Sequence, residues 1–333
     1  MKVLIAAKET KKEFFDRNYG PDNLELACSE QEQDVQKVLD EHSAHHSNLE
    51  SLISAFKSNG IEPVVKARVN TPLYSAYTID DFKAANVIVS FGGDGEVLDV
   101  ARLINKKNLG EHSPLVWAER ADHSSLGALT VGIYHTYDEK VKRLAGEDYR
   151  TEEWARTKGI IKVKYRIVAE DLALDDIYFG DVYAMGMARY TIHIGDKKEY
   201  QMSSGGIIST QVGMQAWLLN VRPDLEDQKN IPTIDKESRA IDYIIREPSK
   251  RTRLGEMLRG KVPADQKIVV VSAMNYDGCV SFDGSKPHYD HSRCYEFNRG
   301  MVLEVSASDD PLRVIRFDDK PGEQITDGKY ATL

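Results

Sequence analysis

The segment from residue 87 to 104 constrains the fold of this chain more than any other. The apolar run Val87–Phe91 indicates a buried strand, and the pattern from Glu96 to Ile104 indicates a helix that begins soon afterwards. Between them lies the turn Gly92-Gly93-Asp94-Gly95. In α/β proteins such a turn is a site for phosphate, because the N–H groups that open the helix are unpaired and the helix dipole attracts anions.

A carboxylate, Asp94, stands at the centre of this turn. Bound polyphosphate would repel it unless the carboxylate bound a metal ion or handled a proton, so the combination suggests phosphoryl transfer. The alternative is a solvent-exposed turn with Asp at its tip, since Asp and Gly are common in turns generally. The four residues alone leave both interpretations open.

The first third of the chain alternates strands and helices. Strands are expected at residues 3–6, 61–69, 87–91 and 114–118, and a long amphipathic helix is expected from Glu30 to Lys57. This alternation predicts a doubly wound parallel sheet with ligands at the carboxyl ends of its strands. The glycine turn falls at such an end.

After about residue 150 the pattern changes to short strands with polar turns. Ile160–Val168 alternates with period two, and Ala188–Ile194, Lys267–Ala273 and Met301–Val305 are further strand-like runs. We therefore expect an α/β domain over residues 1–145 and a mostly antiparallel β domain over residues 146–315. The tail 316–333 is expected to be irregular or to return to the first domain.

Composition narrows the class of partner and the compartment. The formal net charge is −9 and no long basic run occurs, which argues against nucleic acid as the main partner. No apolar run approaches the length of a membrane span, and the opening residues resemble a first strand more than a signal peptide. The three cysteines, Cys28, Cys279 and Cys294, lack the spacing of a disulfide framework. We expect a cytoplasmic protein without a membrane partner.

Several segments, in a consistent order over about residues 1 to 315, resemble the NAD kinase family, which shares a fold relationship with diacylglycerol kinases. The similarity is greatest to the mitochondrial-type branch. The matching segments are Val3-Leu4-Ile5 with Lys8, Glu41–His45 before Asn48-Leu49, Gly92–Gly95, Tyr243–Pro248 and the late Asp283-Gly284 turn.

A further segment, residues 203–217, is similar to the family's glycine-containing loop that binds the dinucleotide substrate. Its matching residues are Thr210, Gly213, Ala216 and Trp217, whereas Gln211, Val212 and Met214 differ. A Thr hydroxyl and a flexible Gly beside an aromatic ring suit a ribose and a flat base. By itself the segment is also compatible with a strand-to-helix junction whose Trp packs in the core.

The chain departs from the family at three positions that concern the acceptor. Gly180-Asp181 replaces an Asn-Glu pair, Glu119 replaces an Asn after the fourth strand, and Met214 replaces a Ser. A pocket built to hydrogen-bond its substrate loses affinity when such partners are missing. Two alternatives to an NAD kinase therefore stay open: a nucleotide-binding relative that has lost transfer, and a related kinase acting on another alcohol.

The resemblance implies an N-terminal doubly wound parallel-sheet domain, a C-terminal mostly antiparallel β domain, and a kinase that forms homodimers or larger homo-oligomers. It implies transfer of the ATP γ-phosphoryl group, with Mg²⁺, to the 2′-hydroxyl of the adenosine ribose of NAD or NADH. Polyphosphate remains an alternative donor, and the preference between NAD and NADH stays open.

The resemblance also assigns roles to individual residues. Asp94 would be the general base, and Gly92, Gly93 and Gly95 would approach the phosphates, with Ser125 and Gly127 flanking the nucleotide. The residues expected to hold the dinucleotide are Asp181, Thr210, Gly213, Ala216 and Trp217.

Three histidines with metal-ligand spacing lie outside these motifs. His42, His45 and His46 are expected on one helix at i, i+3 and i+4. No fourth ligand is apparent from the sequence, so a solvated helix face is the favoured interpretation.

Overall fold

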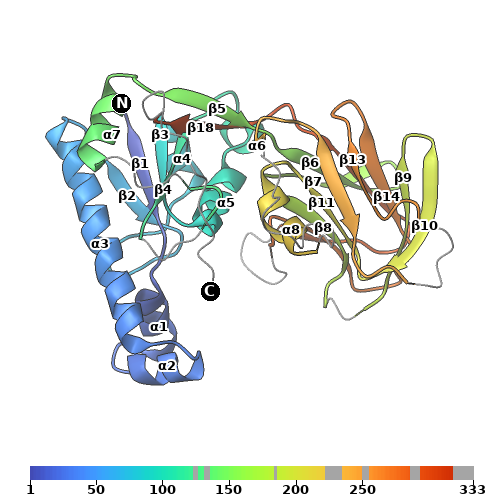
Figure 1. The fold of residues 1–333 in the computed structure, drawn as a ribbon, viewed down its shortest axis with the longest axis horizontal. Helices are drawn as coiled ribbons and strands as arrows, with labels where there is room; N and C mark the ends of the chain where they lie inside the picture. Colours follow the sequence, from blue (N-terminus) through green and yellow to red (C-terminus); the bar gives the residue numbers. More distant parts are fainter. Residues whose placement is uncertain are drawn as a thin grey trace.

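Two lobes, an α/β lobe and a β lobe, lie side by side in the computed structural model (Figure 1). The structure describes residues 1–122, 127–130, 136–183, 186–221, 235–249, 255–285 and 293–317. Among these residues, no helix combines the length and the apolar character needed to cross a membrane.

The N-terminal lobe is built on a six-stranded sheet. Its strands, in spatial order, are β2 (Val64–Ala67), β1 (Val3–Ala7), β3 (Val87–Gly92), β4 (Leu115–Arg120), β18 (Leu312–Arg316) and β5 (Arg150–Trp154). The first five strands are parallel, and β5 pairs antiparallel with β18. Val3, Leu4, Ile5 and the apolar residues of β3 are buried, because both faces of this sheet are covered by helices.

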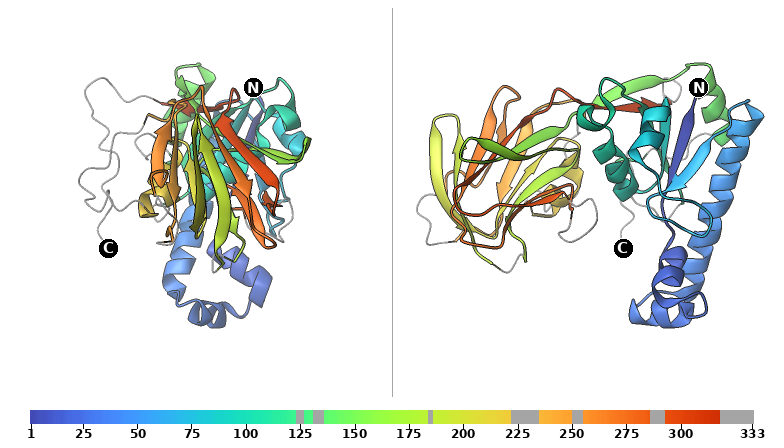
Figure 2. Two further views of the ribbon diagram at one scale, coloured as in Figure 1. Left: turned by 90° about the vertical axis from the view of Figure 1, so that its right-hand side faces the viewer. Right: turned by 180° about the vertical axis from the view of Figure 1, so that it is seen from behind.

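Within the described residues, seven helices accompany this sheet. They are α1 (Lys11–Tyr19), α2 (Leu24–Glu30), α3 (Val35–Ser58), α4 (Ile79–Ala84), α5 (Asp94–Leu103), α6 (Lys106–Leu109) and α7 (Tyr137–Ala145). Apolar residues of α3 and α7 pack on one face of the sheet, and those of α4, α5 and α6 pack on the other. The predicted doubly wound parallel sheet is therefore confirmed. Helices α1 and α2 extend below the sheet beside the N-terminal end of α3 (Figures 1 and 2).

The long helix expected from Glu30 begins later than predicted. Helix α2 ends at Glu30, Glu32 adopts a positive φ of 51°, and Asp34 caps α3 by accepting a hydrogen bond from the Lys37 N–H. A left-handed residue interrupts a right-handed helix, so the polar stretch between the two helices forms a turn.

The C-terminal lobe consists of two antiparallel sheets of six strands. One contains β10 (Lys197–Ser203), β9 (Ala188–Ile194), β14 (Lys267–Ser272), β17 (Met301–Ala307), β6 (Thr157–Val163) and β7 (Arg166–Ala173). The other contains β13 (Arg259–Val262), β12 (Ile241–Ile245), β11 (Gly206–Ser209), β8 (Asp176–Asp181), β15 (Gly278–Phe282) and β16 (Cys294–Glu296). This confirms the mostly antiparallel second lobe. The single strand expected at Ile160–Val168 is instead a hairpin, because the chain reverses at Lys164, whose φ is 54°.

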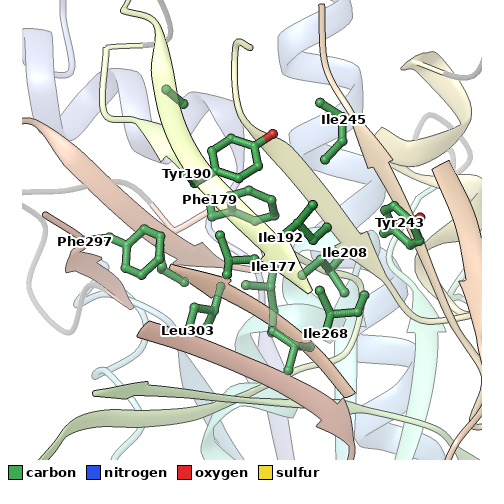
Figure 3. Packing of buried hydrophobic residues seen from close by; sticks show 14 of the residues in the cluster. Ile177, Phe179, Tyr190, Ile192, Ile208, Tyr243, Ile245, Ile268, Phe297 and Leu303 are labelled. Carbon is green, nitrogen blue, oxygen red and sulfur yellow. The ribbon is translucent and has the colours of Figure 1, made fainter. Parts of the chain in front are cut away.

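The two antiparallel sheets bury one core between them (Figure 3). Phe179 of β8 meets Tyr190 of β9 edge-on, with 4.9 Å between ring centroids. Ile192, Ile208 and Leu303 are fully buried in the same cluster. Inward-facing apolar residues therefore hold the two sheets together, as in other β-sandwiches.

The chain passes between the lobes at two neighbouring places. Strands β5 and β18 belong to the N-terminal sheet, although the expected ranges counted both with the second domain. At this crossing the buried Arg156 donates hydrogen bonds to the carbonyls of Ile104 and Asp310, each at 2.6 Å. The expected domain limits stay a prediction. Strands β5 and β18 pair with each other in the N-terminal sheet, and the strands of the β lobe come between them in the sequence.

Candidate functional site

The glycine turn lies where strand order in the N-terminal sheet reverses. The chain runs from β1 outward to β2 and returns to β3 on the other side of β1, so the carboxyl ends of β1 and β3 flank a topological switch point. Lys8 follows β1, and its N–H donates to the carbonyl of Phe91 at 3.0 Å. Gly93 is the N-cap of α5 and Asp94 is the first residue of that helix. The sequence-predicted turn therefore occupies the position where α/β sheets bind ligands.

The carboxylate of Asp94 is held by the segment 127–129. Its Oδ2 accepts the N–H of Ala128 and its Oδ1 accepts the N–H of Leu129, both at 2.9 Å. Gly127 lies so close that a Cβ there would come within 2.2 Å of Asp94 Oδ1. The structure thus brings together Asp94 and Gly127, two of the residues that the sequence singled out. Ser125 lies outside the described residues.

Gly92 and Gly95 occupy different environments in the turn. A Cβ on the buried Gly92 would come within 2.6 Å of the Glu96 Cβ, so this position has no room for a larger side chain. Gly95 is exposed, and nothing lies within 4 Å of a Cβ built on it. Close packing therefore explains why position 92 is a glycine. Gly95 instead lies on an open surface at the N-terminus of α5.

A buried acid, Glu96, lies directly beneath the turn and was not singled out from the sequence. Burial and the neighbouring Asp99 raise the pKa of its carboxyl to about 8. Tyr77 donates a hydrogen bond to it at 3.4 Å. The only signal in the sequence was an acid in the first turn of an amphipathic helix, and such an acid is more often solvent-exposed.

Lys236 and Asp175 connect the Asp94 segment to the β lobe. The ammonium of Lys236 donates to the carbonyl of Ala128 at 2.8 Å and lies 4.4 Å from the ring centroid of Trp154. Burial raises the pKa of Asp175 well above its ordinary value, and the charge of Asp94 contributes to the rise. The positive charge of Lys236 lowers the pKa of the Asp175 carboxyl and so partly offsets this rise. Asp94, Lys236 and Asp175 are therefore electrostatically coupled across the junction of the two lobes.

Asp283, from the late Asp-Gly turn, organises the segment that carries Asp175. Its carboxylate accepts the N–H groups of Leu174 at 3.2 Å, Asp175 at 2.8 Å and Asp176 at 3.3 Å. Arg293 donates to the same carboxylate at 2.8 Å. This turn therefore fixes the backbone between β7 and β8 at the junction.

Thr210 and Gly213 pack against that same backbone. The buried Thr210 hydroxyl donates to the carbonyl of Leu174 at 2.5 Å and accepts the N–H of Gly213 at 3.0 Å. A Cβ on Gly213 would come within 2.2 Å of the carbonyl oxygen of Asp175. Val212, one of the departures from the family loop, is buried in the apolar cluster of the N-terminal lobe. This loop therefore joins the lobes.

Trp217 and Asp181 both contact Tyr178. Trp217 begins α8 (Trp217–Val221), directly after η1 (Gly213–Gln215) and Ala216, and its ring centroid lies 5.5 Å from that of Tyr178. The guanidinium of Arg246 lies 5.0 Å from the centroid of the Trp217 ring. The Tyr178 hydroxyl donates to the backbone carbonyl of Asp181 at 3.0 Å. Trp217 and Arg246 thus lie beside the buried ring of Tyr178, whose hydroxyl contacts the backbone of Asp181.

Another departure, Glu119, is buried in the sheet and does not contribute a free polar group. Its carboxylate binds Lys140 of α7 at 2.8 Å and accepts the Trp117 indole N–H at 2.7 Å. Where the family has an asparagine, this chain has a glutamate that forms a buried ion pair with Lys140. Nothing in the sequence pattern indicated this pairing.

A cavity of about 1130 Å³ lies elsewhere between the lobes. It is lined by α4, α6 and the β7 hairpin, with Lys106, Lys158 and Arg293 among its charged residues. Of the sequence-predicted site residues that the structure describes, none lines this cavity, so it is separate from the junction where Asp94 lies.

The chain resembles known kinases in sequence and in fold. No family profile matches it. It is 21% identical to human mitochondrial NAD kinase 2 over 94% of this chain and 84% of that protein. It is 28% identical to an NAD kinase of Clostridium perfringens over 72% of this chain and 78% of that protein.

Two solved structures share the fold. Yeast NADH kinase, in complex with NADH, superposes with a TM-score of 0.64 at 13% identity over 96% of this chain and 84% of that one. An NAD kinase from Archaeoglobus fulgidus, in complex with ATP, superposes with a TM-score of 0.59 at 14% identity over 95% of this chain and 94% of that one. The fold is the one seen in these kinases, with an α/β lobe joined to a β-rich lobe. In sequence the chain is similar to NAD kinases over most of its length.

Proposed function

We propose that this kinase transfers the γ-phosphoryl group of ATP to the 2′-hydroxyl of the adenosine ribose of NAD or NADH. The observation that carries the proposal is the position of Asp94. Its carboxylate stands at the N-terminus of α5, at the sheet's switch point, and both oxygens are fixed by backbone N–H groups at 2.9 Å. A carboxylate oriented in this way at an anion-binding helix terminus suits a general base for phosphoryl transfer.

The donor phosphates would lie against the turn that precedes α5. The exposed Gly95 leaves its backbone open to a phosphate oxygen, and Gly93 and Asp94 begin the helix whose first N–H groups are free of helical partners. The Archaeoglobus relative with bound ATP supports ATP as the donor. Gly127 and its neighbours would cover the nucleotide from the side that faces the β lobe.

The acceptor dinucleotide would lie on the Trp217 side of the junction. The partly buried Trp217 offers a ring face for a base, Arg246 offers a cation, and Asp181 offers a hydroxyl acceptor. Thr210, Gly213 and Ala216 would shape this loop, since the Thr210 hydroxyl is already engaged with the fold. The yeast relative with bound NADH supports a dinucleotide as the acceptor.

In the reaction, Asp94 would accept the proton of the ribose hydroxyl as its oxygen attacks the γ-phosphorus. The hydrogen bonds from Ala128 and Leu129 occupy one direction on each oxygen, and a carboxylate has about four acceptor directions in all. Asp94 can therefore also face Mg²⁺, which would be bound chiefly by the ATP phosphates. When bound, Mg²⁺ neutralises charge on the transferring phosphoryl group.

The direct test is product formation. Purified protein incubated with Mg²⁺, ATP and NAD or NADH should form NADP or NADPH, measured by chromatography. Polyphosphate in place of ATP tests the donor. Correctly folded protein that forms no product with either acceptor would contradict the proposal.

A second candidate function is nucleotide binding without transfer. The Asp181 carboxylate accepts the N–H of Tyr183 at 2.9 Å, and Gly180 offers no amide in place of the family's Asn. Calorimetric binding of NAD without turnover would favour this candidate. A homodimeric or larger assembly and a cytoplasmic location remain our expectations; the human relative is named as mitochondrial.

A further inference from the structure

A cluster of two histidines and one glutamate joins α1 to α3, away from the Asp94 junction. His42 and His46 lie one turn apart on α3, and Glu13 comes from the first turn of α1. Each offers one ligand atom, and these atoms all lie within 4.8 Å of one another. Two imidazoles and a carboxylate are a donor set that first-row divalent metal ions prefer.

The spacing within the cluster fits a metal ion. His46 Nε2 lies 3.4 Å from Glu13 Oε1. Two ligands of a tetrahedral Zn²⁺, each at 2.0–2.1 Å, are themselves about 3.3 Å apart. His46 Nε2 is buried and has no hydrogen-bond partner within the described part of the chain. A buried polar atom without a partner is costly unless something binds it.

Thr10 orients two of the three ligands. Its hydroxyl lies 3.0 Å from Glu13 Oε2 and 2.8 Å from His42 Nδ1, and it accepts the N–H of Glu13 at 3.3 Å. If the single Thr10 proton is donated to the carboxylate, His42 must donate its Nδ1 proton to Thr10. That tautomer leaves the lone pair of His42 on Nε2, available to a metal. Such outer hydrogen bonds are how metal-binding imidazoles are oriented.

The buried His45 connects the cluster to strand β3, close to the glycine turn. The ring of the buried His45 lies 5.2 Å from that of His46 and 5.3 Å from that of Phe91 in β3. The charges of Lys12 and Asp16 of α1 also act on His42. These two residues form an ion pair with each other at 2.6 Å. A bound ion would therefore connect α1 to α3 close to the sheet, in addition to the apolar cluster that Phe15 and Val38 form between these helices.

We propose that Glu13, His42 and His46 bind a divalent transition-metal ion, Zn²⁺ in particular, as a structural clamp between α1 and α3. Solvent would complete the coordination, since His42 and His46 are only partly buried. The clamp is independent of the phosphotransfer site, because none of its ligands lies at the junction of the lobes.

The test is a Zn²⁺ titration of the full, metal-stripped chain against a chromophoric chelator. We expect one tightly bound Zn²⁺ and a rise in the thermal unfolding midpoint on binding. Glu13→Gln keeps the helix cap with Thr10 but removes the anionic ligand, and His46→Asn removes an imidazole; each should weaken binding by more than about tenfold. His193→Ala, in β9 of the other lobe, is the matched control and should bind as the unaltered chain does.

Titration with Co²⁺ keeps the proposal testable if a variant fails to fold. The unaltered chain should give the visible d–d absorption of a nitrogen- and oxygen-bound Co²⁺ without a thiolate charge-transfer band. Absence of stoichiometric binding, a thiolate band, or unchanged binding in both ligand variants would overturn the assignment.

Discussion

Gly127 lies directly against the carboxylate of Asp94, so that a Cβ at position 127 would come within 2.2 Å of Asp94 Oδ1. The contact lets the N–H groups of Ala128 and Leu129 reach the two carboxylate oxygens. This relationship between residues 33 positions apart links the glycine turn to a segment whose role the sequence only suggested.

Gly127→Ala should therefore misplace Asp94. The new methyl group must move the carboxylate or the segment, and a misplacement of about 1 Å can lower a catalytic rate by about a hundredfold. We expect kcat for NADP formation to fall by that order while the protein stays folded. Gly146→Ala, after α7, is the control, because the nearest atom to its Cβ would be 3.3 Å away. Equal rates for both variants would show that the contact does not position Asp94.

Trp217→Ala should impair acceptor binding selectively. Loss of an aromatic stacking surface costs about 1–3 kcal/mol per base, which corresponds to a roughly five- to 150-fold rise in KM for NAD. KM for ATP should change little, because Trp217 lies with Tyr178 and Arg246 on the β lobe. Steady-state kinetics with each substrate varied in turn is the measurement, and Tyr165→Ala, at an exposed turn, is the control. A parallel rise in both KM values would refute a separate acceptor surface.

Lys140→Met should destabilise the N-terminal lobe by about 3–5 kcal/mol, because it leaves the buried Glu119 carboxylate without its cation. Adding Glu119→Gln should restore much of the loss, since the amide is neutral and still accepts the Trp117 N–H. Urea unfolding of both single variants and the double variant measures the coupling. Additive losses would mean that the pair does not interact as the structure shows.

Glu96 should contribute a loss of stability as pH rises from about 4.5 to 8. The folded state holds a proton on this buried carboxyl up to a pKa of about 8, whereas the ordinary pKa of a glutamate, as in the unfolded chain, is 4.5. The folded state thus binds more protons over this window, so the free energy of unfolding decreases with rising pH and levels off above it. Asp176, whose pKa burial raises to about 7, contributes with the same sign.

Glu96→Gln should flatten this pH dependence and leave the protein more stable than the unaltered chain above pH 8. Urea unfolding at pH 5.5 and 8.5 measures the difference, with Glu62→Gln, an exposed acid, as the control. An unchanged slope in Glu96→Gln would show that Glu96 is already ionised in the folded protein.

The local units of the fold were predictable where the sequence pattern was strong. The apolar run of β3, the glycine turn and the periodic residues of α5 predicted a strand, a turn and a helix, and all three are present. The break before α3 and the reversal at Lys164 were missed, because polar residues without glycine adopt positive φ there.

Contacts between residues far apart in the sequence were harder to predict. Glu119 pairs with a lysine on another element, and the histidines of α3 meet a glutamate that only the packing of α1 supplies. Thr210 was expected to face the substrate, but its hydroxyl is engaged with the carbonyl of Leu174. Such contacts depend on which faces the packed elements present to each other, and one sequence carries little information on that.

The most direct test of the account is kcat of Asp94→Asn, measured together with calorimetric binding of ATP and NAD. Asparagine cannot accept a proton, and one of its two terminal groups would face an N–H that the carboxylate now accepts. We predict a loss in kcat of about 10²–10⁴-fold, the typical contribution of a general base, with both ligands still bound. Asp80→Asn, on the exposed face of α4, should retain full activity. Near-normal turnover by Asp94→Asn would contradict the assignment of Asp94 as the base.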